Sequence, residues 1–263
     1  MAKEIIFMKI LLVFRDKNSV LINKIRKEIE NSVKDSITEI AWKNKLSKTQ
    51  FQDKDLIITI GGDGTFLSAS HFITSQLILG VNSDPKRSAG FLTSISLKHF
   101  AKKLKQISKN KYKINTYQRI SAKIFQKDKC VLVENALNEI YIGNSKPQHV
   151  SVYNLNLNKR KELQKSSGIL ISTGTGSTAW YKSMGGKPFN KLSKTLKFIV
   201  REPLNVKTHK TKMKNGQIKS NEKIIIENKT NHTILAVDSI REYKLTKRDL
   251  VEISLGEEIR VIE

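Results

Sequence analysis

The sequence predicts an α/β domain built on an open parallel sheet, followed by a domain made mostly of β-strands. Over about the first ninety residues, short apolar runs alternate with segments of helical periodicity, which is the order expected for a sheet covered by helices. Beyond residue 108, short strand-like runs follow one another with polar turns between them, as in an all-β domain. With 263 residues, the chain is long enough for two domains with separate cores.

The first part contains four expected strands and two expected helices. The strands are residues 9–14, 37–42, 56–60 and 77–81, and the helices are residues 18–32 and about 63–73. Residues 56–60 are β-branched and apolar on both faces, as in a strand buried inside a parallel sheet. Polar loops follow residues 60 and 81. Both lie at the carboxyl ends of strands, which is the edge where open α/β sheets bind ligands.

The second part begins after a basic amphipathic helix that is expected at residues 97–108. The strand-like segments that follow are residues 117–125, 131–142, 150–157, 169–172, 198–200, 223–227 and 233–237. The tail of the chain has one more strand-like run, at residues 258–262. Because little helical periodicity separates these segments, we expect this part to be β-rich.

A glycine-rich turn follows the expected strand at residues 56–60. Residues 61–65 are Gly-Gly-Asp-Gly-Thr. The three glycines permit a sharp turn and a close approach of the backbone to a ligand, and a helix N-terminus beside such a turn is a common anion site. The carboxylate of Asp63 would repel a phosphate beside it. It is therefore better explained as a base or as a group linked to a metal ion.

Three further stretches have polar groups that suit a nucleotide. Asn138 and Glu139 place an amide beside a carboxylate, a pair that can hold a vicinal diol, although a turn at a strand end would also explain it. Residues 172–180, Ser-Thr-Gly-Thr-Gly-Ser-Thr-Ala-Trp, form a loop that can lie against a sugar or phosphate, with Trp180 as an aromatic face. Arg87 follows a proline-containing turn and could pair with phosphate oxygens.

The formal net charge of +24 could indicate a polyanionic partner. However, lysine is spread over every segment without a basic stripe interleaved with aromatic residues, which favours compositional bias over a specific nucleic-acid site.

Cys130 is the single cysteine, so a reducing compartment is expected. The five histidines have no paired metal spacing, and no metal ligand is assigned to a protein side chain. The start lacks a secretory segment and no run spans a bilayer, so we expect a cytoplasmic protein without a membrane or specific nucleic-acid partner.

Taken together, these stretches resemble the NAD kinase family. The resemblance rests on residues 61–65, 81–88, 138–139, 166–168, 173–180 and 201–203. It covers roughly residues 9–205, and the variants at 81–88, 166–168 and 201–203 are most similar to mitochondrial-type NAD kinases. The glycine turn alone would not separate this family from its diacylglycerol kinase and sphingosine kinase relatives.

The resemblance implies a Rossmann-like N-terminal α/β domain, a β-rich C-terminal domain and a nucleotide site between them. We accordingly expect domains at residues 1–96 and 97–237, with residues 238–263 returning to the first. The implied reaction transfers the terminal phosphoryl group of ATP, or of polyphosphate in some members, to the adenosine ribose 2′-hydroxyl of NAD. Mg²⁺ is the expected divalent cation, and a homodimer or homotetramer is the expected assembly.

The resemblance also implies roles for individual residues. Asp63 is the expected base that faces the ribose hydroxyl. The residues expected to bind NAD are Phe91, Asn138, Glu139, Thr178, Ala179, Trp180 and Ser183. The residues expected to contact phosphates are Gly62, Gly64, Thr65 and Arg87. Most bacterial members have an aspartate that contacts the dinucleotide where this chain has Ser167, which leaves the preference for NAD over NADH open.

Two other functions remain open from the sequence. A lipid kinase of the diacylglycerol or sphingosine type would share the glycine turn, but it would need an apolar acceptor pocket. The Asn138–Glu139 pair and the polar loop at 173–180 favour an acceptor rich in hydroxyl groups instead. A non-catalytic nucleotide- or polyanion-binding protein would account for the net charge, but it would gain nothing from the Asp63 carboxylate.

Overall fold

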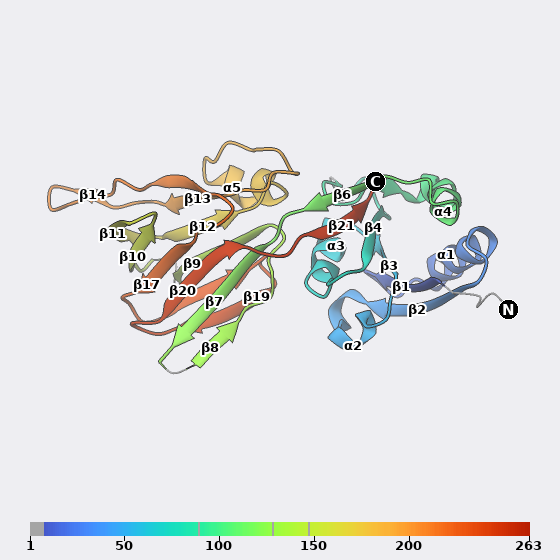
Figure 1. The fold of residues 1–263 in the computed structure, drawn as a ribbon, viewed down its shortest axis with the longest axis horizontal. Coiled ribbons are helices and arrows are strands. Elements are labelled where there is room, and N and C mark those ends of the chain that lie inside the picture. Colours follow the sequence, from blue (N-terminus) through green and yellow to red (C-terminus); the bar gives the residue numbers. More distant parts are fainter. Residues whose placement is uncertain (1–7, 89, 128, 147) are drawn as a thin grey trace. The chain divides into compact units, whose positions relative to one another are not determined.

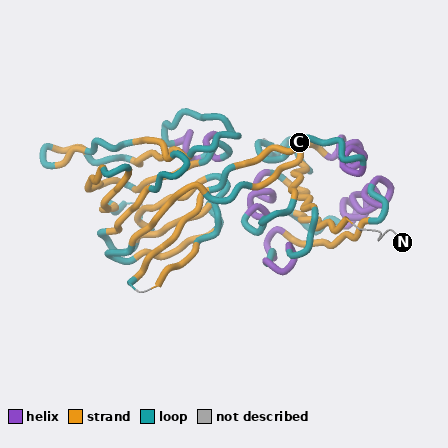
Figure 2. Tube along the Cα trace, in the orientation of Figure 1, coloured by secondary structure: helices purple, strands orange, loops and turns teal. Residues whose placement is uncertain are grey.

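The computed structural model describes residues 8–88, 90–127, 129–146 and 148–263, and the chain divides into two compact units. Unit 1 comprises Met1–Thr116 and Ile259–Glu263, and unit 2 comprises Tyr117–Glu258 (Figure 1). Most of the helix lies in unit 1, whereas unit 2 is almost entirely strand and loop (Figure 2). None of the helices in the described part of the chain has the length and apolarity needed to cross a bilayer.

Unit 1 is built on a sheet with the order β2–β1–β3–β4–β21–β6, and the short β5 pairs with β4. The strands are β1 (Met8–Phe14), β2 (Ser36–Trp42), β3 (Leu56–Gly61), β4 (Leu77–Asn82), β5 (Ile95–Ser96), β6 (Ile114–Tyr117) and β21 (Ile259–Ile262). The pairs among β1, β2, β3, β4 and β21 are parallel. β3 is buried along its whole length, which explains its uninterrupted apolar sequence.

The helices of unit 1 are α1 (Ser19–Ser32), α2 (Lys48–Phe51), α3 (Asp63–Ser70) and α4 (Phe100–Ser108), with 3₁₀ helices at Lys43–Lys45 and Leu97–His99. α1 begins after Asn18, whose side chain accepts a hydrogen bond from the Leu21 N–H at 3.0 Å. Ile25 and Ile29 of α1 share a buried cluster with side chains of α4, β1 and β3. α3 ends at Ser70, three residues before the predicted end.

Unit 2 consists of two antiparallel sheets that share one core. The strand orders are β11–β10–β17–β20–β7–β8 and β16–β13–β12–β9–β18–β19, and β14 pairs with β15. The strands are β7 (Ile120–Gln126), β8 (Lys129–Leu132), β9 (Glu139–Asn144), β10 (Ser151–Leu157), β11 (Arg160–Ser166), β12 (Gly168–Ser172), β13 (Leu196–Arg201), β14 (Asn205–Val206), β15 (His209–Lys210), β16 (Asn215–Ile218), β17 (Ile224–Asn228), β18 (Thr233–Val237), β19 (Arg241–Leu245) and β20 (Leu250–Leu255). Inward-facing side chains of both sheets form a single buried cluster.

A short helical segment lies against the second sheet of unit 2. It comprises a 3₁₀ helix at Gly176–Thr178 and helix α5 (Trp180–Ser183). Tyr181 of α5 is buried in a small cluster with Tyr141 of β9 and Leu170 of β12. The face of this sheet that points away from the main core is therefore partly covered by α5.

The unit boundaries differ from the expected domain boundaries. The chain leaves unit 1 after Thr116 instead of residue 96, because α4 packs into the core of unit 1. Residues 238–258 stay in unit 2, because β19 pairs with β18 and β20 pairs with β17 and β7. The strand expected at 131–142 is divided between β8 and β9. The expectation that the start of the chain is not a secretory segment concerns in part residues 1–7, which lie outside the described residues.

A close approach at Gly80 fixes the segment that follows β4. A Cβ atom at Gly80 would lie 2.8 Å from Cδ2 of Phe66, 2.9 Å from Cα of Thr93 and 3.0 Å from the Leu92 carbonyl oxygen. Two of these three neighbours are backbone atoms, so they cannot yield by a change of rotamer. The absence of a side chain at Gly80 therefore lets residues 92–93 lie directly on the sheet.

We predict that Gly80→Ala lowers the free energy of unfolding by about 1–3 kcal/mol, because the added methyl group overpacks this contact. Gly64→Ala is the matched control. There a Cβ atom would meet the flexible Lys43 Nζ at 3.3 Å, and alanine favours the helix. Urea unfolding of both variants tests this, and equal midpoints for Gly80→Ala and the wild type would show that the contact is not restrictive.

Candidate functional site

The glycine turn of unit 1 connects the carboxyl end of β3 to α3. Gly62 precedes the helix as its N-cap residue, and Asp63 is the first helical residue. Thr65 is 1% exposed, and its hydroxyl has no hydrogen-bond partner among the described residues. A Cβ atom at Gly61 would overlap this hydroxyl, so glycine is required there to make room for Thr65. The turn thus places a buried hydroxyl beside a helix N-terminus, where an anion is stabilised.

The Asp63 carboxylate joins this turn to the loop after β4. Its Oδ2 accepts a hydrogen bond from the Phe91 N–H at 3.0 Å, and its Oδ1 accepts from Leu92 and Thr93 at 2.8 and 3.3 Å. The Asp63 N–H in turn donates to Ser88 Oγ at 3.4 Å. Sequence reasoning proposed Asp63 only as a base or metal-linked group. The structure adds that it anchors the loop containing Phe91.

Two other expected residues of unit 1 lie on the same loop. Phe91 is 61% exposed, so its ring is available to a ligand. Arg87 is also exposed, and its Nε lies 3.6 Å from Asp84 Oδ2. The loop is fixed at its start by Asn82, whose Nδ2 donates to the Ser88 carbonyl at 3.2 Å. Phe91 and Asp63 are therefore brought together directly, whereas Arg87 is held by an exposed ion pair.

In unit 2, the Asn138–Glu139 pair and the loop at 173–176 are joined through their backbones. The Thr173 N–H donates to the Asn138 carbonyl at 3.0 Å, and the hydroxyls of Thr173 and Thr175 donate to the Leu137 carbonyl at 2.5 and 2.6 Å. Gly176 lies against Asn138 so closely that a Cβ atom would overlap the Asn138 carbonyl. The small hydroxyl and glycine residues of the loop thus serve to hold the Asn138–Glu139 pair.

Two polar atoms of this pair are buried and unpaired. Asn138 Oδ1 and Glu139 Oε2 have no hydrogen-bond partner among the described residues. Buried polar atoms are nearly always hydrogen-bonded in native proteins, because an atom buried without a partner lowers the stability of the folded state. Two such atoms on adjacent residues therefore suit a ligand with two neighbouring hydroxyl groups.

Burial raises the pKa of the Glu139 carboxyl to about 8, and the charge of Asp238 adds to the rise. Asp238 follows β18, and its carboxylate accepts the N–H groups of Leu137, Asn138 and Glu139 at 2.7, 2.8 and 2.9 Å. Asp238 was not among the residues expected from the sequence. Its partners lie about one hundred residues away in the chain, and a polar residue after an apolar strand is too common to identify it.

An aromatic surface continues from Glu139 along the sheet. Tyr141 follows Glu139 by two residues on β9, so both side chains lie on the same face. The rings of Tyr141 and Trp180 are 4.9 Å apart between centroids and inclined by 34°. The Tyr141 hydroxyl donates to the Ser167 carbonyl at 2.5 Å, and a Cβ atom at Gly143 would overlap the Tyr141 ring. Trp180 is therefore held in place by a partner that the sequence did not identify.

The remaining expected residues lie at the surface around α5. Thr178, Ala179 and Ser183 are exposed, and Ser183 Oγ donates to the Ala179 carbonyl at 3.5 Å. These three residues share one short segment with Trp180, which packs on Tyr141 beside the Asn138–Glu139 pair. Unit 2 thus brings all of its expected NAD-binding residues into one region.

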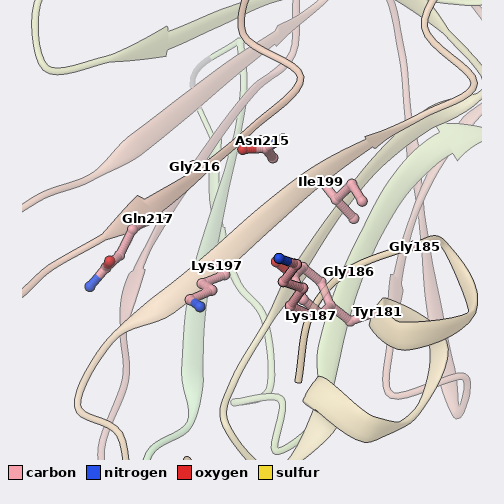
Figure 3. A pocket seen from close by; sticks show the side chains of 9 residues that line it. All are labelled: Tyr181, Gly185, Gly186, Lys187, Lys197, Ile199, Asn215, Gly216 and Gln217. Atoms are coloured by element: carbon pink, nitrogen blue, oxygen red, sulfur yellow. The ribbon is translucent and has the colours of Figure 1, made fainter. Parts of the chain in front are cut away.

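A pocket of about 490 Å³ borders the same segment. It is lined by Tyr181, Gly185, Gly186, Lys187, Lys197, Ile199, Asn215, Gly216 and Gln217 (Figure 3). These residues include two lysines and two amides but no carboxylate, so the pocket favours an anion. Lys197 Nζ lies 4.5 Å from the centroid of the Phe189 ring. None of the residues expected to bind NAD lines this pocket.

The described residues contain no group of three or more His, Cys, Asp or Glu side chains arranged to hold a metal ion. Mg²⁺ is commonly bound through one or two carboxylates together with substrate phosphates. In the glycine turn, Asp63 is the carboxylate that could serve as such a ligand.

We predict that Glu139 makes the stability of the protein depend on pH. Its pKa is about 8 in the folded protein against an ordinary 4.5, so its stabilising effect is complete below the ordinary value and is lost as the pH rises through about 8. In Glu139→Gln this loss should disappear, so the wild type should lose more unfolding free energy than the variant between about pH 5 and pH 9. Urea unfolding across this range measures the difference, and parallel pH curves would show that Glu139 titrates normally.

Two family models match most of the chain. The ATP-NAD kinase N-terminal domain matches residues 11–112, and the ATP-NAD kinase C-terminal domain matches residues 137–262. Together they include the glycine turn, the Asn138–Glu139 pair and the loop at 173–180. They also include Asp238 and the strands around it.

Several proteins similar to this chain are named NAD kinase or NADH kinase. A probable NADH kinase of Oryza sativa subsp. japonica is 30% identical over 213 residues, which cover 73% of this chain and 65% of the relative. An NADH kinase of Arabidopsis thaliana is 31% identical over 63% of this chain and 60% of its own. The matches thus span less than two thirds of these plant relatives. An NAD kinase of Lachnospira eligens is 24% identical over 95% of this chain and 89% of its own.

Two solved structures share the fold. Yeast NADH kinase complexed with NADH has a TM-score of 0.84 at 16% identity and covers 97% of this chain and 83% of its own. An NAD kinase from Archaeoglobus fulgidus in complex with ATP has a TM-score of 0.75 at 21% identity, covering 97% and 94%. The matching family models, with the joined motifs of unit 2 and the glycine turn of unit 1, show that the chain belongs to the NAD kinase family.

Proposed function

We propose that this protein transfers the terminal phosphoryl group of ATP to the adenosine ribose 2′-hydroxyl of NAD, giving NADP. The principal support is the buried, unpaired pair of atoms Asn138 Oδ1 and Glu139 Oε2, which suits the two hydroxyl groups of a ribose. Family membership and the names of the relatives, among them NAD kinases and NADH kinases, agree with this acceptor.

On the acceptor side, Asn138 and Glu139 bind the ribose and the segment around Trp180 lines the dinucleotide. The Trp180 ring, supported by Tyr141, provides a flat apolar surface of the kind on which an aromatic base stacks. Thr178, Ala179 and Ser183 provide small exposed groups beside it. Phe91 provides a second exposed ring, which we assign to the adenine. We infer that the lysines of the neighbouring pocket attract anionic nucleotides but take no part in phosphoryl transfer.

On the donor side, Asp63 accepts the proton of the attacking hydroxyl while the glycine turn holds the phosphates. Phosphoryl transfer depends mainly on positioning and on neutralisation of charge. Gly62, Gly64 and Thr65 supply backbone groups and a free hydroxyl at the helix N-terminus, and Arg87 exchanges its exposed ion pair with Asp84 for a phosphate. Mg²⁺, when bound with ATP, neutralises phosphate charge. Of the roughly four lone-pair sites of the Asp63 carboxylate, three accept N–H groups, and the remaining one can accept the hydroxyl proton.

We further propose that the protein is a cytoplasmic homo-oligomer, a dimer or tetramer, and that ATP is preferred to polyphosphate as the donor. The preference for ATP is supported by the solved relative in complex with ATP. Both NAD and NADH are candidate acceptors, because two relatives are named NADH kinases. At the position of the usual aspartate, the Ser167 hydroxyl donates to Glu202 Oε2 at 2.5 Å, so a carboxylate is still present close to this site.

The reaction is tested by incubating the purified protein with ATP and Mg²⁺ and with NAD, NADH or diacylglycerol as the acceptor. We expect phosphorylation of the dinucleotide, no phosphorylation of the lipid, and loss of turnover when EDTA removes the divalent cation. Polyphosphate replaces ATP in a parallel reaction. Phosphorylation of diacylglycerol alone would establish the lipid kinase alternative. Absence of any product, with nucleic-acid binding that weakens steeply with salt, would favour the polyanion-binding alternative.

We predict that Asp63→Asn lowers turnover by about two to four decades, because the amide cannot accept the hydroxyl proton. The same substitution weakens acceptance of the N–H groups of Phe91, Leu92 and Thr93. Amide hydrogen exchange of residues 90–94 therefore has to accompany the rate measurement. Slow turnover with unchanged exchange supports the role as base, whereas nearly full activity would exclude it. Slow turnover with fast exchange would assign the loss to the loop.

A further inference from the structure

A buried aspartate lies directly beneath the acceptor pair. Asp238 is 3% exposed and has a positive φ of 49°, as does the following Ser239 with 54°. Non-glycine residues rarely adopt this conformation. Besides accepting the three N–H groups of residues 137–139, Asp238 donates its own N–H to the Glu139 carbonyl at 3.0 Å. Four hydrogen bonds therefore tie one residue to three consecutive residues of the acceptor site.

We propose that Asp238, supported electrostatically by Arg119, is a positioning residue that holds Asn138 and Glu139 in the geometry that binds the ribose. The inference rests on the proposed function, because it assigns Asp238 to the site that binds the acceptor. Asp238 acts through the backbone of its neighbours and does not itself touch the ribose. Its three accepted bonds fix the backbone from which both side chains extend, since consecutive peptide groups with fixed N–H directions leave the chain little freedom.

Arg119 is a buried positive charge that interacts electrostatically with Glu257 and Asp238. The Arg119 side chain is 1% exposed, and its Nε donates to the Glu257 carbonyl at 2.8 Å. Burial lowers the pKa of Arg119 to about 10, against the opposing effect of the Glu257 and Asp238 carboxylates, so it stays charged at neutral pH. A buried charge is tolerated when it is paired and hydrogen-bonded. For Asp238 the three N–H groups provide the hydrogen bonds, and Arg119 contributes a favourable electrostatic interaction.

The raised pKa of Glu139 matters for the ligand that this carboxyl can bind. Asp238 is the charged group that acts on Glu139 from the turn after β18. On β12 the residue paired with Glu139 is Ser172, and the adjoining loop at 173–176 contributes threonine and glycine. With a pKa of about 8, Glu139 is mostly neutral at pH 7. A neutral carboxyl donates one hydrogen bond and accepts another, which matches a ribose diol.

The test compares Asp238→Asn with Asp249→Asn. Asp249 is a matched control, because it is also buried in unit 2 at 4% exposure and its Oδ2 accepts the Thr246 N–H at 2.7 Å, but it lies in the turn between β19 and β20. We expect Asp238→Asn to raise the KM for NAD by about tenfold or more, as for loss of hydrogen bonds to a charged group, with a smaller change in kcat. Asp249→Asn should lower stability while leaving the KM unchanged.

The pH profile separates positioning from a general loss of stability. In the wild type, kcat/KM for NAD should fall as the pH rises through about 8, because the neutral form of Glu139 is lost. In Asp238→Asn this fall should move to lower pH, because the neighbouring negative charge that disfavours ionisation of Glu139 is gone. Glu139→Gln keeps Asp238 and replaces the carboxyl with an amide of nearly the same shape that does not ionise. In this variant the fall of kcat/KM above about pH 8 should be absent. An unchanged profile in either variant would overturn the proposal.

Amide hydrogen exchange distinguishes failure of this inference from failure of the proposed function. Residues 137–139 should exchange faster in Asp238→Asn than in the wild type or in Asp249→Asn, whatever substrate the protein accepts. Unchanged exchange, with NAD still phosphorylated, would overturn the positioning role alone. Faster exchange in a protein that phosphorylates no dinucleotide would support Asp238 as the anchor of residues 137–139 but would contradict the proposed acceptor. If Asp238→Asn does not fold, Asp238→Glu takes its place in the exchange and KM measurements, and unchanged exchange of residues 137–139 with an unchanged KM would overturn the positioning role.

Discussion

In each unit, an aspartate carboxylate that accepts three consecutive backbone N–H groups holds a segment with candidate functional residues. In unit 2, Asp238 holds residues 137–139, and the arrangement of Asn138 and Glu139 depends on it. In unit 1, Asp63 holds residues 91–93 in the same way. Peptide N–H groups that converge on one carboxylate fix a loop without regular secondary structure. Each unit thus obtains a defined loop at the point where ligand-binding side chains are needed.

The two aspartates differ in what they do for the chemistry. Asp238 is buried, and its charge adds to the effect of burial in raising the pKa of Glu139, so its effect reaches the ligand through a neighbour. Asp63 lies at the start of α3 beside three glycines and is proposed to receive a proton itself. The family models that match both parts of the chain cover the residues of both loops. Membership of the NAD kinase family therefore agrees with a dinucleotide acceptor and not with a lipid acceptor.

Local features of the site could be predicted from the sequence, but its supporting contacts could not. The glycine turn and the strand before it were predicted because glycine spacing and continuous apolar runs are local signals. Asp238 and Tyr141 were missed because their roles depend on the pairing of β9 with β18 and β12, which join residues far apart in the chain. Strand β11 was missed because it lies at a sheet edge and its residues Arg160–Ser166 are mostly polar. The second domain began later than expected because α4 packs on α1, a contact that periodicity alone does not specify.

The central claim is that the unpaired atoms of Asn138 and Glu139 receive the hydroxyl groups of the adenosine ribose. A crystal structure of the protein with NAD bound tests it most directly. The account predicts ribose oxygens within hydrogen-bond distance of Asn138 Oδ1 and Glu139 Oε2, with residues 137–139 still bonded to Asp238. A dinucleotide bound elsewhere, for instance in the lysine-lined pocket, with these two atoms still unpaired, would contradict it.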